Sequence, residues 1–177
     1  ATTQALKGLS NLLNYYTHTG NVTKEDYFDL LLQYAKSHSI KTEKGENQKW
    51  IDENLNPFTG DWISRTRLKS WNNGTWSREK GGVERGKDYN HSGFCDLIIS
   101  DLLGLKPRED NIIEINPLIP NNWDWFCLDK VRYHERELTV VWDRTGEKYN
   151  KGNGLLIFVD GILKAKTNEI ERLTYKL

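Results

Sequence analysis

The stretch FCDLIISDLLGLKPRED, residues 94–110, is where the sequence changes from helical to strand-like periodicity. Its apolar residues recur at helical spacing and mark one broad face: Phe94, Leu97, Ile98, Leu102 and Leu105, widened by Ile99 and Leu103. A face this broad predicts a buried helix that starts near Ser92. Pro107 and the charged residues 106–110 then break the pattern, so we expect a domain boundary here.

Two amphipathic helices are expected upstream. The first ends at a glycine stop, Gly20, and has an apolar face made of Leu6, Leu9, Leu13 and Tyr16. The second opens with a capping box, Thr23 to Asp26, and has an apolar face made of Phe28, Leu31, Leu32, Ala35 and His38. The short turn between them predicts a helical hairpin. We interpret His38 as a core or boundary histidine, because no Cys or His lies at metal-ligand spacing from it.

The strand-like pattern continues downstream to the last strong apolar run. The expected strands include Ile113 with Ile115, Trp125 to Leu128, Leu138 to Asp143, and Leu155 to Val159. Asp160-Gly161 is a two-residue hairpin signal. Helices followed by strands predict an α+β chain, and we favour two modules, residues 1–110 and 111–177. The β module is too small to stand alone, so we expect it to pack on the helices or to borrow strands from elsewhere.

Composition narrows the classes of partner. The number of lysines and arginines equals the number of aspartates and glutamates, at 25 each. The chain therefore has no net positive charge that would attract nucleic acid or an anionic membrane. The longest apolar runs are too short to cross a bilayer. The two cysteines, Cys95 and Cys127, are expected to be buried free thiols. We expect no cofactor and no metal.

The region from Lys41 to Asn90 carries turn formers but little periodicity. It holds Trp50, Trp62, Trp71 and Trp76, four of the seven tryptophans. A loop of this length is more often functional than not, although its indoles could equally form a small core of their own. Within it, Glu53 lies beside a proline turn and close in sequence to Trp50 and Trp62. Carboxylates and aromatic rings are the groups that glycoside-cleaving sites use.

The eight residues from Glu53 to Gly60, ENLNPFTG, resemble a Glu-Asn-Tyr-Asp-Pro-Leu-Thr-Gly type of segment. That segment lies near the end of the catalytic domain in the processing α-glucosidase I family and its bacterial relatives, including mannosylglycerate hydrolase-like glycosidases. In those proteins an aromatic-led helix start follows, and Tyr89 to Ser92 takes its place here. Residues 62–110, 116–118 and 123–128 are also similar to bacterial members of this group.

The resemblance implies that residues 1–110 are the final helices and active-site loop of an (α/α)6 barrel. Residues 111–177 would be a small antiparallel β module of sandwich-like kind. It further implies an inverting glycoside hydrolase in which Glu53 is the general base that activates water. The general acid would be an aspartate from a part of the barrel that precedes Ala1. The chain contains no methionine and begins at Ala1 in what already has a helical pattern, so we expect a processed or truncated polypeptide. The resemblance implies a fragment that is inactive alone.

Other residues in the same region are candidates for binding sugar. Trp50 and Trp62 could form part of the wall, and His91 stands where the family pattern has a tryptophan. Glu84, Asp88 and Tyr89 follow or lie within a glycine-rich run that lets backbone approach a ligand. Glu84 is also the reserve candidate for the base, because related trehalases carry a catalytic glutamate in a similar place. Asp96 is expected to be a first-turn acid that complements the helix dipole.

A rival hypothesis is a non-catalytic carbohydrate-binding module, in which tryptophans dock a glycan, and a third is a purely structural fragment. The locally basic residues 65–87, interleaved with Trp71 and Trp76, could bind single-stranded nucleic acid, but the neutral whole disfavours this. The expected partners are an oligosaccharide or glycoside and the missing N-terminal part of the same protein. A periplasmic or secreted location would suit the family, and the sequence leaves it open.

Overall fold

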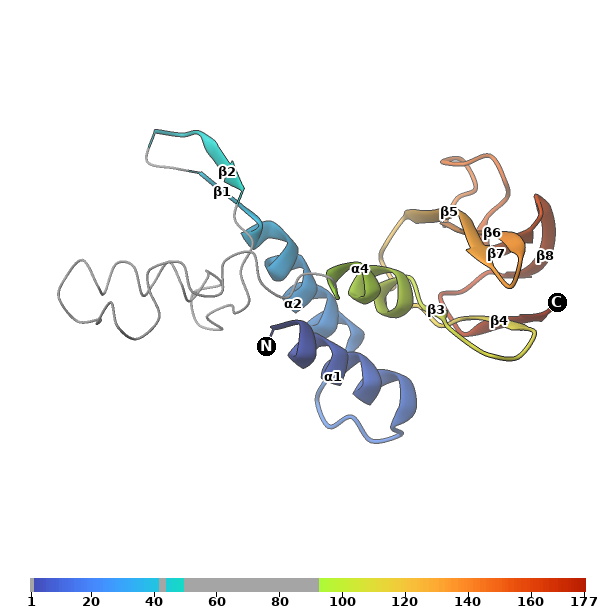
Figure 1. The fold of residues 1–177 in the computed structure, drawn as a ribbon, viewed down its shortest axis with the longest axis horizontal. Helices are drawn as coiled ribbons and strands as arrows, with labels where there is room; N and C mark the ends of the chain where they lie inside the picture. Colours follow the sequence, from blue (N-terminus) through green and yellow to red (C-terminus); the bar gives the residue numbers. More distant parts are fainter. Residues whose placement is uncertain (1, 42–43, 50–92) are drawn as a thin grey trace.

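The computed structural model describes residues 2–41, 44–49 and 93–177 of the 177-residue chain. Helices come first and antiparallel strands follow, and the two parts lie side by side along the long axis (Figure 1). The predicted α+β class is confirmed.

A helical hairpin opens the fold, with α1 at Thr2–Tyr15 and α2 at Lys24–Ser37. The predicted capping box is present: Asp26 N donates to the Thr23 hydroxyl at 3.3 Å, and Thr23 N donates to the Asp26 carboxylate at 2.8 Å. These two bonds satisfy amides that would otherwise lack a partner at the helix start. The expected place of Tyr16 is wrong, because it follows the last residue of α1 and is 67% exposed.

The buried face of α2 differs from the predicted one. Tyr27, Leu31 and Tyr34 are buried, whereas Ala35 is exposed and His38 is half-buried as the C-cap. Tyrosine can occupy the core here because each hydroxyl has a hydrogen-bond partner, so burial leaves no polar atom unsatisfied. The Tyr27 hydroxyl donates to the Leu97 carbonyl at 3.0 Å, and the Tyr34 hydroxyl lies 3.2 Å from the Thr3 hydroxyl.

Several short helices and strands follow α2 or begin after residue 92. β1 (Ser39–Lys41) and β2 (Asn47–Lys49) form a small antiparallel pair, which the sequence did not predict. The expected helix is present as α4 (Phe94–Asp96) followed by a π-helical segment, η2 (Leu97–Leu102). Its predicted extension to Leu105 is wrong, because Leu105 and Lys106 form strand β3.

Two further antiparallel sheets contain the remaining strands. The three-stranded sheet has the order β3-β4-β9, with β4 at Ile112–Ile115 and β9 at Leu173–Lys176. The four-stranded sheet has the order β5-β6-β7-β8, built from Trp125–Tyr133, Arg136–Asp143, Gly154–Val159 and Ile162–Thr167. The predicted Asp160-Gly161 hairpin is confirmed, since both residues have positive φ (51° and 77°), as a tight two-residue turn requires.

One hydrophobic core joins the helices to the strands. It includes Leu6 of α1, Tyr27 of α2, Leu97 of η2, Ile113 of β4 and Ile157 of β7, each almost fully buried. Burying an aliphatic side chain of this size contributes about 1.5–3 kcal/mol, so contacts across the core hold the two parts in one arrangement. The expectation that the strands pack on the helices is confirmed.

The two cysteines are free thiols, as predicted, but their predicted burial is wrong. Cys95 is exposed on α4 and Cys127 is half-buried on β5. Within the described ranges, no helix combines the length and apolar character that a membrane span needs.

Candidate functional site

All the sugar-site residues predicted from the sequence lie outside the described residues. They are Glu53, Trp50, Trp62, Glu84, Asp88, Tyr89 and His91, which fall within residues 50–92. Their roles stay predictions. The expected first-turn acid, Asp96, is described: it lies in the first turn of α4 and is exposed.

A cavity of about 540 Å³ lies between α1, the α4–η2 helix and β3. Gly93, on its wall, is the first described residue after the range that holds the predicted sugar-site residues. The lining is mostly polar in residue type: Thr3, Gln4, Lys7, Asn11, Tyr15, Gly93, Asp96, Leu97, Ser100, Asp101, Lys106 and Pro107. Its volume falls within the range of about 300–1,000 Å³ that is usual for ligand pockets.

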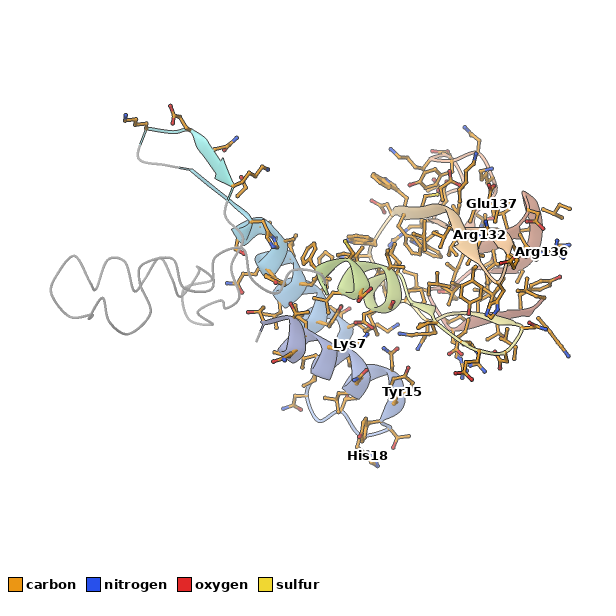
Figure 2. All side chains as sticks on the ribbon, viewed as in Figure 1. Lys7, Tyr15, His18, Arg132, Arg136 and Glu137 are labelled. Carbon is orange, nitrogen blue, oxygen red and sulfur yellow. The ribbon has the colours of Figure 1, made fainter. Side chains whose placement is uncertain are left out.

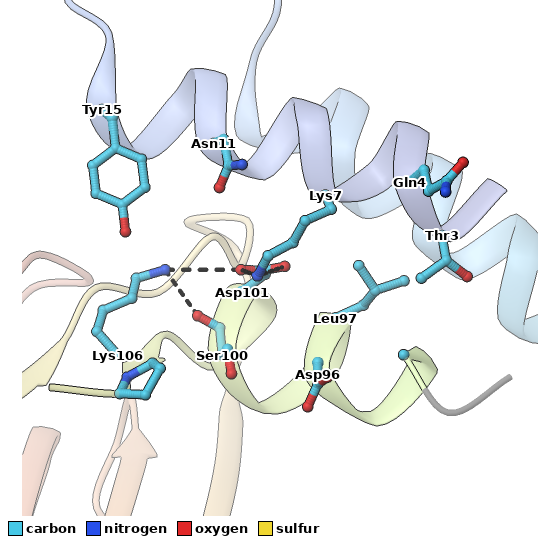
Figure 3. Close-up of a pocket in the computed structure, with 12 residues that line it drawn as sticks. Thr3, Gln4, Lys7, Asn11, Tyr15, Asp96, Leu97, Ser100, Asp101 and Lys106 are labelled. Carbon is cyan, nitrogen blue, oxygen red and sulfur yellow. Dashed lines mark hydrogen bonds and ion pairs between the residues drawn. The ribbon is translucent and has the colours of Figure 1, made fainter. Parts of the chain in front are cut away.

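A buried carboxylate, Asp101, lies at the centre of this cavity wall (Figure 3). Its side chain is 2% exposed, and both oxygens accept hydrogen bonds from the Lys7 ammonium, at 2.8 and 3.0 Å. The Lys106 ammonium lies 4.0 Å from the nearer oxygen and donates to the Ser100 carbonyl at 2.8 Å. A buried charge needs such partners, because removing it from water is costly.

Tyr27 is a buried side chain close to the cluster formed by Lys7, Asp101 and Lys106. Burial raises the pKa of its hydroxyl well above the usual range, and the nearby negative charge of Asp101 raises it further. The hydroxyl therefore stays protonated and acts as a donor to the Leu97 carbonyl. This bond ties α2 to the start of η2, next to the turn that carries Asp101.

The turn after η2 explains how Lys106 reaches the cluster. Leu103 N donates to the Ile98 carbonyl at 2.8 Å, the wider spacing of a π-helix, and Gly104 then reverses the chain with φ 85°. A Cβ at Gly104 would lie 2.3 Å from the backbone of Asn116, so only glycine fits this close approach. The reversal returns Lys106 alongside Ser100.

A second cavity, of about 250 Å³, adjoins the first and shares Tyr15, Lys106 and Pro107 with it. Its other charged groups are paired: Arg108 contacts Glu114 at 2.6 Å, and Arg172 contacts Glu114 at 2.9 Å. Arg108 also contacts the Asp110 carboxylate at 2.6 Å, which lowers the pKa of that carboxyl group.

A third cavity, of about 340 Å³, lies on the four-stranded sheet, away from α1. Figure 2 labels three of its residues, Arg132, Arg136 and Glu137, and shows them far from Lys7 and Tyr15. Its charges pair on the surface, for example Arg136 with Asp160 at 3.0 Å. Exposed ion pairs of this kind interact only weakly, because water screens their charges. The first cavity contains a buried charged cluster and is therefore the better candidate site.

The first cavity offers charged and neutral polar groups that can bind a ligand. Asp101 is held by Lys7, and the described residues contain no cluster of three or more His, Cys, Asp or Glu side chains that could hold a metal ion. Sequence reasoning missed Lys7, Asp101 and Lys106. The one available signal was an acid inside an otherwise apolar helical face at position 101.

Comparison with known proteins finds matches to two family models and to solved structures. Residues 1–92 match the mannosylglycerate hydrolase MGH1-like glycoside hydrolase domain, and residues 105–163 match the C-terminal domain of glycosyl hydrolase family 65. A solved structure described as a sialidase is 38% identical, with a TM-score of 0.72. That alignment covers 97% of this chain and 14% of the sialidase chain, so this chain spans a small part of its length.

The first match extends over half of the chain and includes the segment from Glu53 to Gly60, on which the family resemblance was based. The predicted resemblance to mannosylglycerate hydrolase-like glycosidases is thereby confirmed. The chain belongs to the mannosylglycerate hydrolase MGH1-like glycoside hydrolase family.

Proposed function

We propose that this chain is the C-terminal part of an inverting glycoside hydrolase and that Glu53 is the general base. The observation that carries the proposal is the family match over residues 1–92, which contains Glu53. In this proposal residues 1–110 are the last helices and active-site loop of an (α/α)6 barrel. Residues 111–177 are an appended β module of sandwich-like kind.

The mechanism requires two carboxyl groups on opposite faces of the sugar. Glu53 removes a proton from water as the water attacks the anomeric carbon, and an acid protonates the leaving oxygen. In inverting enzymes the two groups lie about 6.5–9.5 Å apart, which leaves room for the water. The acid in this proposal is an aspartate from an earlier part of the same protein, so residues 1–177 alone do not hydrolyse glycosides.

The sugar-binding wall in this proposal consists of residues from the same segment. Trp50 and Trp62 stack on apolar sugar faces, and the polar side chains of Glu84, Asp88 and Tyr89 bond hydroxyl groups. His91 contributes an imidazole in place of the indole in the family pattern. The substrate class is an oligosaccharide or glycoside.

The test is Glu53→Gln in the full-length protein, measured by hydrolysis of a panel of aryl glycosides. Loss of a general base lowers kcat by about 10²- to 10⁴-fold while sugar binding, measured by calorimetry, is retained. Glu25→Gln changes an exposed acid on α2 that has no role in this proposal, so it is the matched control and should retain the wild-type activity. Glu84→Gln, which removes a sugar contact, should lower activity much less than Glu53→Gln. Near-normal turnover in Glu53→Gln, with the loss found in Glu84→Gln instead, would move the base to Glu84. The anomeric form of the first product, read by NMR, tests inversion.

A further inference from the structure

Lys106 is a buried cation whose hydrogen-bonding capacity is not used up by the described residues. Its side chain is 10% exposed, and its ammonium carries three N–H donors. One donates to the Ser100 carbonyl at 2.8 Å. The nearer Asp101 oxygen is 4.0 Å away, which is too long for a hydrogen bond. At least one donor is therefore left for another acceptor.

Positive charge is in excess in the immediate surroundings of Lys106. Asp101 faces two ammonium groups, and Lys7 takes both of its oxygens at hydrogen-bonding distance. Asp96 lines the same cavity, but it is exposed and lies one helical turn before Ser100. In the adjoining cavity Arg108 and Arg172 are each paired with Glu114. Glu114 lies opposite Lys106 in the β3–β4 register, but these two arginines share its carboxylate. The cluster of Lys7, Asp101 and Lys106 itself has one carboxylate for two ammonium groups, a net charge of +1.

Neutral polar side chains face the same space. Asn11 and Tyr15 line the cavity, and Figure 3 shows the Tyr15 ring directed toward the Lys106 ammonium. Neither side chain has a hydrogen bond with another described residue. Leu97 and Pro107 supply apolar wall on either side of the polar groups. An ammonium group forms charge-assisted hydrogen bonds with an anion, and neutral donors beside it can bond the same anion.

We propose that Lys106, together with Asn11 and Tyr15, binds a carboxylate in this cavity. The carboxylate belongs either to a free acidic sugar or to an Asp or Glu side chain from another part of the same protein. Both sources offer the same group to the same donors. Burial lowers the pKa of Lys106 and the positive charge of Lys7 adds to this effect, although the negative charges of Asp101 and Glu114 oppose it. A bound carboxylate offsets that unfavourable burial.

The first arm of the test uses calorimetry on the full-length protein with sodium glucuronate as the probe. Glucose is the matched control, since it has the same ring without the carboxylate. If the source is a free sugar acid, glucuronate binds the wild type and Lys106→Arg, and binds Lys106→Met about tenfold more weakly, the loss expected for one charged hydrogen bond. Glucose shows no heat that depends on Lys106.

The second arm uses the wild-type protein and needs no variant. A carbodiimide joins a carboxylate to an ammonium in contact with it, with net loss of water, and peptide mass spectrometry locates the new amide bond. If the source is the protein itself, Lys106 becomes linked to an Asp or Glu other than its described neighbours Asp96, Asp101 and Glu114, and glucuronate does not bind. The proposal is overturned if Lys106 forms no such link and glucuronate binding does not depend on it. Neither arm involves Glu53, so this result is separate from the proposed catalysis.

Discussion

Replacing Asp101 by asparagine removes the negative charge that Lys7 and Lys106 share, while it keeps the size of the side chain. The carboxylate is 2% exposed and accepts two hydrogen bonds from Lys7, at 2.8 and 3.0 Å. Removing one partner of a buried ion pair costs about 3–5 kcal/mol. Lys7 is 44% exposed and can turn toward water, so we expect a smaller loss, about 2–3 kcal/mol.

Hydrogen exchange followed by mass spectrometry measures this loss locally, without requiring the whole protein to unfold in one step. A loss of this size speeds exchange of the amides in residues 97–106 by about 30- to 150-fold in the Asp101→Asn protein. Asp96→Asn is the matched control, because Asp96 is an exposed acid on the same helix. It should leave these rates almost unchanged.

A double variant tests the cause of the effect. Lys7→Met removes one of the two ammonium groups that Asp101→Asn leaves without a carboxylate, so the combined loss should be smaller than the sum of the single losses. Strictly additive losses, or equal exchange rates in the Asp101→Asn and Asp96→Asn proteins, would refute the account of Asp101 as the shared buried counter-charge.

Three further predictions concern the fold and its titrating groups. Gly104→Ala should lower the thermal unfolding midpoint much more than Gly161→Ala, because both have positive φ but only Gly104 meets backbone, at 2.3 Å; equal shifts would contradict this. Burial lowers the pKa of His38 from 6.5, so its stabilising effect is complete above pH 6.5 and declines as the pH falls below that value. His38→Gln should therefore flatten the decline in unfolding midpoint on acidification, and an unchanged slope would count against it. Iodoacetamide should modify exposed Cys95 before half-buried Cys127, whose thiol pKa is raised by burial; peptide mapping that gives the reverse order would oppose this.

Local sequence signals determined most of the secondary structure. The capping box at Thr23 and Asp26 sets the start of α2 through bonds between residues only three apart. Alternating and continuous apolar runs predicted strands β4 to β7, and Asp160-Gly161 predicted the tight turn after them. These features depend on neighbours within one turn or one hairpin, so the sequence alone contains the information needed.

The tertiary structure decided the residues whose role depends on distant partners. Leu105 has the spacing of a helical face, yet the reversal at Gly104 and pairing with Ile115 make it part of a strand. Tyr27 can be buried because its hydroxyl donates a hydrogen bond to the Leu97 carbonyl, 70 residues away.

The candidate sites likewise include residues that the sequence indicated and others that only the tertiary structure brings together. The family resemblance was visible in the sequence because the segment from Glu53 to Gly60 and the other stretches that carry it are each contiguous. The cluster of Lys7, Asp101 and Lys106 carries no such local signal, since Lys7 and Asp101 are 94 residues apart. Their attraction arises only after the core has brought α1 against η2, where the loss of water makes a compensating charge necessary.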